Sequence, residues 1–150
     1  MLDASGTKAA TAIVRGRLRD QGGPVSPDGR WIAYSTEDSG RFEINVQSFP
    51  TPGRKVQVSE NGAVRAWWTR DGRQLVFHDG DLRGLWRVDL QPGETLGVGT
   101  PRRIATLPPD IVWLDAMLDR QRFLAIAPER TGTGSITVVQ NWRASLAGTR

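Results

Sequence analysis

The chain has 150 residues, of which 38% are hydrophobic and 24% charged, with a net charge of +4 and no cysteine. This length is typical of one domain, and no apolar run approaches the roughly 18 residues that span a bilayer, so we expect no membrane partner. The absence of cysteine excludes disulfides, a thiolate nucleophile and cysteine metal sites, and the scattered arginines indicate no nucleic-acid partner.

The first eight residues, MLDASGTK, lack the basic segment and apolar core of a secretory signal, so the sequence as written predicts a cytoplasmic location. Residues 9–17 then predict a single strand with β-branched residues at its centre. Three arginines at and just beyond the end of this segment are spaced two residues apart, which places them on one face of a strand: Arg15, Arg17 and Arg19. We interpret them as a solvated edge, with a polyanion contact as the alternative.

An internal repeat begins after this strand. Residues 26–34, SPDGRWIAY, recur as 69–77, TRDGRQLVF, and more faintly as 118–126, LDRQRFLAI. The aspartates of successive copies lie 43 and 48 residues apart. A period of about 40 to 50 residues is typical of four-stranded propeller blades.

Each copy predicts a hairpin, because Asp-Gly between apolar runs supplies a side-chain acceptor and a positive φ. The residues assigned to these structural turns are Asp28, Gly29, Asp71, Gly72 and Asp119. In the third copy Arg120 replaces the glycine, so that turn is predicted to be longer, strained or of a different type.

Alternating segments predict third strands at 42–46, 86–90 and 136–138, and segments 55–59 and 102–107 predict fourth strands. The fold class is therefore all-β, a β-propeller with about three four-stranded antiparallel blades. As a single partial propeller, the chain divides into a stray outer strand (9–17), a first blade (20–60), a second blade (61–108), an incomplete third blade (109–142) and a tail (143–150).

At these residues the chain resembles TolB-like propellers with WD40-like "PD40" repeats, whose signature is a Ser-Pro-Asp-Gly-Arg/Lys hairpin followed by apolar residues and an aromatic. Residues 26–34 match it fully, and 121–142 look like the C-terminal end of large bacterial proteins that carry such a propeller. The resemblance covers most of residues 20–142. It implies the fold and a family that is often periplasmic, and it leaves function open.

Three blades leave two blade faces uncovered, whereas propellers usually have four to eight. Either the chain is part of a longer propeller, or two copies close a six-bladed ring in which each lends its strand 9–17 to the other. We predict the homodimer.

The loops between second and third strands share one face with the loops between blades, and ligands usually bind there in this architecture. Acidic residues in these loops are candidate Ca²⁺ ligands: Glu37, Asp38, Asp79, Asp81 and Asp110. The competing interpretation is that they are ordinary solvated turn residues. Resemblance to propeller lactonases, which hold calcium in the channel, makes a calcium-assisted hydrolase the alternative function.

The aromatic residues divide by position. Trp31, Trp68 and Trp86 are predicted to lie in the core. Four residues on innermost strands border the predicted channel and are candidate ligand-binding residues: Arg65, Trp67, Trp113 and Asp115. The single histidine, His78, stands without a Gly-x-Ser-x-Gly motif, so we favour a packing role over a catalytic base.

Together these patterns predict a binding or scaffold module that recognises a protein, peptide or small ligand through this loop face. The catalytic residues of the alternative, a calcium-assisted lactonase, are not identified by any motif.

Overall fold

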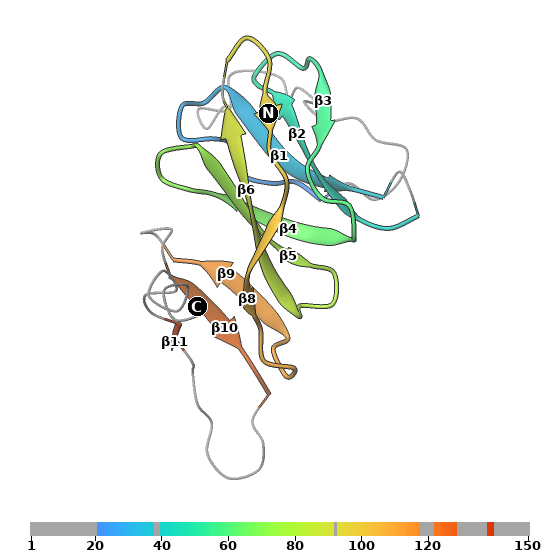
Figure 1. Cartoon of the computed structure of the whole chain (residues 1–150), viewed down its shortest axis with the longest axis vertical. Coiled ribbons are helices and arrows are strands. Elements are labelled where there is room, and N and C mark those ends of the chain that lie inside the picture. Colours follow the sequence, from blue (N-terminus) through green and yellow to red (C-terminus); the bar gives the residue numbers. More distant parts are fainter. Residues whose placement is uncertain (1–20, 38–39, 92, 118–121, 129–137, 140–150) are drawn as a thin grey trace, which may run out of the picture.

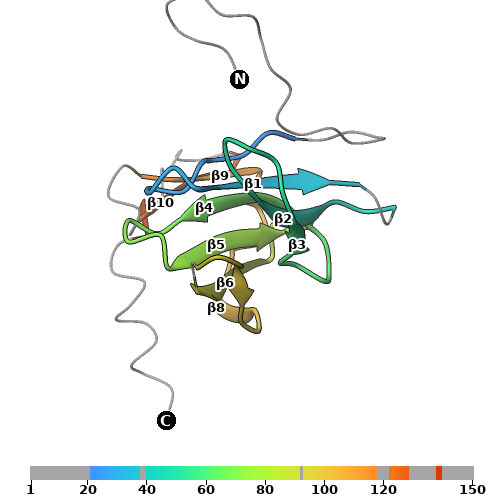
Figure 2. The same ribbon diagram turned by 90° about the horizontal axis from the view of Figure 1, so that it is seen from above.

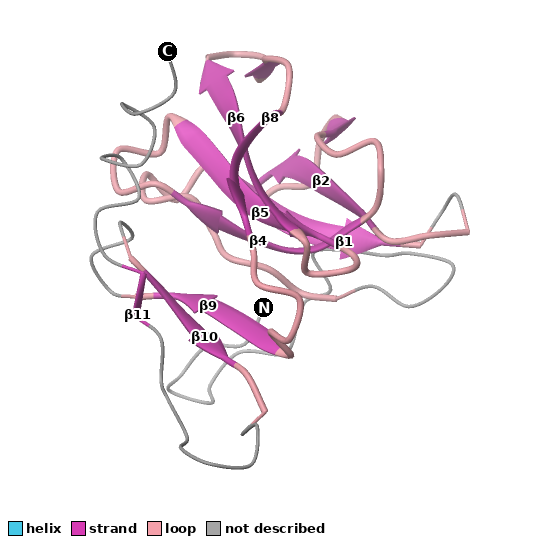
Figure 3. Cartoon of the chain, turned by 60° about the horizontal axis from the view of Figure 1, so that its bottom comes forward, coloured by secondary structure: helices cyan, strands magenta, loops and turns pink. Residues whose placement is uncertain are grey.

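The computed structural model describes residues 21–37, 40–91, 93–117, 122–128 and 138–139. These residues form β-strands joined by loops and turns, with no helix among them (Figure 3). They therefore contain no helix that could cross a membrane.

The strands form three antiparallel sheets that follow one another along the chain (Figure 1). The first sheet contains β1 (Trp31–Thr36), β2 (Glu43–Ser48) and β3 (Lys55–Gln57). The middle sheet contains β4 (Ala63–Trp68), β5 (Gln74–Asp79), β6 (Gly84–Gln91), β7 (Gly97–Val98) and β8 (Arg102–Thr106). The third sheet contains β9 (Trp113–Ala116), β10 (Phe123–Ile126) and β11 (Val138–Val139).

Strand order repeats from sheet to sheet. The first sheet has the order β1-β2-β3 and the third β9-β10-β11, while β4, β5 and β6 are consecutive neighbours in the middle sheet. Both β7 and β8 pair with β6. Residues 21–25 lie along the free edge of β1 through the bridges Gln21 to Ser35 and Val25 to Ile32. The predicted fourth strands are present as β3 and β8, whereas β7 was not predicted.

The first repeated hairpin is closed by its own side chains. Asp28 Oδ1 accepts hydrogen bonds from Ser26 Oγ at 2.5 Å and from the Arg30 backbone N–H at 3.1 Å. The Ser26 hydrogen bond is the main reason that the pKa of Asp28 lies below its ordinary value. Gly29 has a φ of 71°, in the left-handed region that glycine adopts without strain. These hydrogen bonds are consistent with the structural role predicted for Asp28.

The second hairpin repeats this arrangement with other residues. Asp71 Oδ1 accepts from Thr69 Oγ1 at 2.7 Å and from the Arg73 N–H at 3.1 Å, and Gly72 has a φ of 69°. The Thr69 hydrogen bond is the main cause that lowers the pKa of Asp71. The same turn chemistry therefore serves both copies.

In the third repeat, a backbone hydrogen bond joins two residues with the same separation along the chain as in the first two hairpins. The backbone N–H of Met117 donates to the carbonyl of Arg122 at 2.8 Å, just as Ser26 donates to Trp31 at 2.8 Å and Thr69 to Gln74 at 2.9 Å. Each pair lies five positions apart. The predicted turn residues Asp119 and Arg120 lie outside the described residues.

Two hydrophobic clusters cover the two faces of the middle sheet, because successive side chains of a strand point to opposite faces. On β5, Leu75 and Phe77 belong to the cluster shared with the first sheet, and Val76 belongs to the cluster shared with the third. Trp31 and Trp68 are buried in the former and Trp86 packs against it, which confirms their predicted core positions. Seen from above, β4 lies next to β1 (Figure 2), with which it is in contact.

The predicted all-β, antiparallel organisation is confirmed, and its arrangement is consistent with a β-propeller-like fold. Several predictions fall outside the described residues: the strand 9–17, the arginines at 15, 17 and 19, and the tail 143–150.

Candidate functional site

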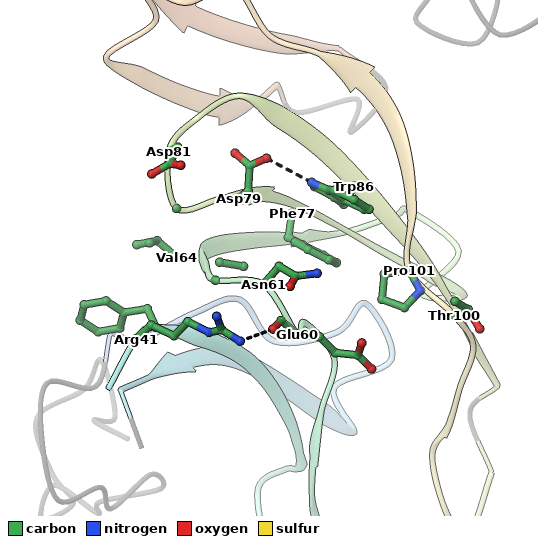
Figure 4. A pocket seen from close by; sticks show the side chains of 14 residues that line it. Arg41, Glu60, Asn61, Val64, Phe77, Asp79, Asp81, Trp86, Thr100 and Pro101 are labelled. Atoms are coloured by element: carbon green, nitrogen blue, oxygen red, sulfur yellow. Dashed lines mark hydrogen bonds between the residues drawn. The ribbon is translucent and has the colours of Figure 1, made fainter. Parts of the chain in front are cut away.

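A cavity of about 560 Å³ opens between the first and middle sheets, and we call it the loop-face cavity (Figure 4). The β1–β2, β3–β4 and β5–β6 loops all contribute to its wall, so it lies on the face that the sequence predicted for ligand binding. Apolar side chains form much of the lining: Phe42, Ala63, Val64, Phe77, Trp86 and Pro101. Three carboxylates also line it: Glu60, Asp79 and Asp81.

Asp79 is held by the turn that it begins. Its Oδ1 accepts the backbone N–H of Arg83 at 2.7 Å, and its Oδ2 accepts the indole N–H of Trp86 at 3.3 Å (Figure 4). In the same turn Leu82 has a φ of 55°, which is unusual for a bulky residue. The Asp79 contacts stabilise this turn and fix the position of Asp81 at the cavity wall.

Glu43 anchors the opposite wall from a buried position on β2, where it is 2% exposed. Its carboxylate accepts hydrogen bonds from Ser59 Oγ and from the backbone N–H of Gly62, the latter at 2.9 Å. Arg41 Nε lies 2.8 Å from the same carboxylate, and its Nη2 donates to the Glu60 carbonyl. This network holds the loop that carries Glu60.

The predicted calcium ligands lie in several places. Asp79 and Asp81 line the loop-face cavity, Glu37 follows β1, Asp110 lies between β8 and β9, and Asp38 is outside the described residues. Across residues 21–37, 40–91, 93–117, 122–128 and 138–139, no three carboxylate or histidine side chains are grouped as metal ligands would be.

The four candidate residues on innermost strands come together in the structure. Trp67 Nε1 donates to Asp115 Oδ1 at 2.6 Å, and Arg65 Nη1 lies 3.6 Å from Asp115 Oδ2. The guanidinium carbon of Arg65 is 5.6 Å from the centre of the Trp113 ring, within the range of a cation–π contact. Strands β4 and β9 therefore share one polar and aromatic cluster.

A second cavity of about 320 Å³ lies beside this cluster, and we call it the inner-strand cavity. Its wall is formed by residues 21–24, by β1 and β4, and by Asp115 of β9. Ser35 also lines this cavity. The sequence did not indicate it as a site residue, because it lies in β1, whose pattern is typical of a buried core strand.

His78 is a buried residue of β5 whose ring centre lies 5.9 Å from that of Trp67. Its Nδ1 lies 2.6 Å from the backbone carbonyl of Asp79, and since a carbonyl only accepts, Nδ1 carries the proton. Burial lowers the pKa of His78, which keeps the ring neutral. The predicted packing role agrees with these contacts.

No family model matches the chain, and no curated protein matches it either. Among solved structures, the orthorhombic crystal form of an acylaminoacyl peptidase from Pyrococcus horikoshii is similar, with a TM-score of 0.42 and 17% identity. The match covers 69% of this chain and 16% of the peptidase chain. The chain therefore spans only a small part of that enzyme's length.

Proposed function

We propose that the chain is a binding module whose loop-face cavity takes a cationic, partly apolar ligand, such as a peptide segment with a lysine or arginine beside an apolar residue. The observation that carries this proposal is the pairing of an apolar lining with three carboxylates in one cavity on the predicted binding face.

The apolar part of the lining provides a surface for the body of the ligand. Phe77, Trp86 and Pro101 come from three different segments of the middle sheet and border the same space (Figure 4). The volume falls in the range of about 300–1,000 Å³ that is typical of small-molecule and peptide side-chain sites. Burial of an apolar side chain here would supply most of the affinity.

The charge of the cavity favours a cation. The chain carries a net charge of +4, yet Glu60, Asp79 and Asp81 meet in this cavity. Arg41, which also lines it, forms an ion pair with the buried Glu43 and so adds little positive potential. Exposed carboxylates contribute modestly to affinity, and their main effect is to discriminate between ligands of opposite charge.

The supporting network favours a preformed site. Glu43 links β2 to the β3–β4 loop, and Asp79 caps the β5–β6 turn, so both walls are fixed by hydrogen bonds within the chain. A preformed site loses less conformational entropy when a ligand binds.

The test measures binding of fluorescein-labelled capped tetrapeptides, Ala-X-Phe-Ala, in which X is lysine, glutamine or glutamate. We expect the lysine peptide to bind more tightly than the glutamine peptide, and the glutamate peptide to bind least. The double variant Glu60→Gln/Asp81→Asn should weaken the lysine peptide about tenfold and leave the glutamine peptide nearly unchanged.

The matched control is Glu94→Gln, which removes an exposed carboxylate outside the cavity. It should leave all three affinities unchanged. Equal affinity for the three peptides, or an equal response of the double variant and the control, would overturn the proposal.

A further inference from the structure

The inner-strand cavity has the chemistry of a second binding site, separate from the loop-face cavity. We propose that it binds a neutral saccharide or polyol. The proposal rests on two features of the cavity lining, a buried hydroxyl and an ion pair that can accept further hydrogen bonds, and on an exposed indole ring that lies beside the cavity.

The hydroxyl belongs to Ser35, which lines the cavity and is 1% exposed. Within the part of the chain that the structure describes, its Oγ has no hydrogen-bond partner. Buried polar side-chain atoms are bonded in the large majority of cases, and each exception calls for an explanation. A ligand hydroxyl in the cavity would satisfy Ser35 either as donor or as acceptor.

The ion pair is that of Arg65 and Asp115, whose side chains are 46% and 41% exposed. Asp115 Oδ1 already accepts from Trp67 Nε1 at 2.6 Å and from the Ala116 N–H at 2.8 Å. Its Oδ2 faces Arg65 across 3.6 Å, too long for a strong hydrogen bond. A hydroxyl between them could donate to Asp115 and accept from Arg65 at the same time.

The balance of charge argues for a neutral ligand. Arg65 and Asp115 cancel each other, so neither an anion nor a cation gains without separating the pair. A saccharide hydroxyl, by contrast, can donate to Asp115 and accept from Arg65 while the ion pair stays in place. This distinguishes the inner-strand cavity from the acidic loop-face cavity.

The indole ring is that of Trp113, which is 37% exposed and stands outside the cavity lining, against the guanidinium of Arg65, which is part of that lining. An exposed aromatic face can cover the apolar face of a sugar ring. Gly22 and Gly23 contribute two positions without side chains to the cavity lining. At Gly22 the space where a Cβ would stand is open, with no atom within 4 Å.

The experiment measures binding of D-glucose, N-acetyl-D-glucosamine and cellobiose to the full chain by calorimetry and saturation-transfer NMR, with acetate and methylammonium as the anionic and cationic probes. We expect one or more of the neutral sugars to bind and the charged probes not to bind. No sugar binding at about 20 mM, or binding of the charged probes alone, would overturn the proposal.

The decisive variant is Ser35→Ala. Removal of an unpaired buried hydroxyl should raise the thermal midpoint of the free chain, while sugar binding weakens about three- to tenfold. Asp115→Asn should weaken sugar binding by a similar factor. Asp81→Asn, which alters only the loop-face cavity, should not. Unchanged sugar affinity in Ser35→Ala would contradict the inference and leave the loop-face proposal untouched.

Discussion

The buried carboxylate of Glu43 accepts the backbone N–H of Gly62 at 2.9 Å, although the two residues lie 19 positions apart. The contact joins β2 to the loop that leads into the middle sheet. Ser59 Oγ and Arg41 Nε donate to the same carboxylate, so three donors from two loops, β1–β2 and β3–β4, converge on it.

We therefore predict that Glu43→Gln destabilises the chain by about 2–4 kcal/mol, because a neutral amide loses the charge-assisted bonds and presents an N–H group to donors. Urea denaturation followed by tryptophan fluorescence measures this change. Ser59→Ala removes only one donor and should cost about 1–2 kcal/mol. Equal stability of Glu43→Gln and the parent chain would show that the network does not support the fold.

A second prediction concerns two neighbouring glycines. A Cβ at Gly23 would lie 1.8 Å from the Ala33 carbonyl oxygen, whereas a Cβ at Gly22 would meet nothing within 4 Å. Gly23→Ala should therefore separate residues 21–25 from β1 and cost about 3 kcal/mol or more. Gly22→Ala, the matched control, should change the free energy of unfolding by less than about 1 kcal/mol. Similar thermal midpoints for the two variants would contradict the close approach.

The hairpins, and the cluster that β4 shares with β9, could be inferred from the sequence because both follow from the repeat. Asp28 and Asp71 form bonds within their own turns, so local pattern suffices. Trp67 and Asp115 are 48 positions apart, the same spacing that separates the aspartates of the second and third copies. The repeat predicted that both lie on innermost strands, and in the structure these equivalent positions of adjacent sheets lie side by side.

The roles of Glu43 and Ser35 could not be predicted from the sequence in this way. Glu43 alternates with the core residues Ile44 and Val46, which predicts a solvent-facing side chain, and its burial depends on donors from another loop. Ser35 Oγ lacks a partner among the described residues and Ser35 borders a cavity, and cavities arise from how sheets pack. Neither property is local to a strand.

A third prediction is that stability depends on pH near neutrality through His78, the single histidine of the chain. Burial lowers its pKa in the folded state below the ordinary 6.5. Below pH 6.5 the unfolded chain therefore takes up a proton more readily than the folded chain. The contribution of His78 to stability is present above about pH 6.5 and is lost as the pH falls through the lowered folded-state pKa.

Proton NMR gives a direct check, since one histidine produces one titrating ring signal. We expect its midpoint in the folded chain to lie below 6.5. Urea midpoints measured between pH 7.5 and 5.5 should fall with pH in the parent chain and much less in His78→Gln. A folded-state midpoint at or above 6.5 would contradict the burial argument.

The last prediction concerns the oligomeric state. We propose that the chain forms a homodimer, because the described residues form three sheets, fewer than the four to eight blades of a closed propeller. Val112 and Ile126, which are joined by a backbone hydrogen bond beside the third sheet, are 62% and 50% exposed. Burial of two such side chains in a contact with a second copy would stabilise the pair by about 1.5–3 kcal/mol each.

Light scattering should accordingly give twice the chain mass of 16.5 kDa. The double variant Val112→Ser/Ile126→Thr should shift the equilibrium towards the monomer, while Glu94→Gln should not. Ile13→Asp/Val14→Asp tests whether the predicted strand 9–17, which lies outside the described residues, contributes to the contact. A mass of 16.5 kDa at about 100 μM would contradict the homodimer. Two contacts that together close a ring should give a dissociation constant well below that concentration.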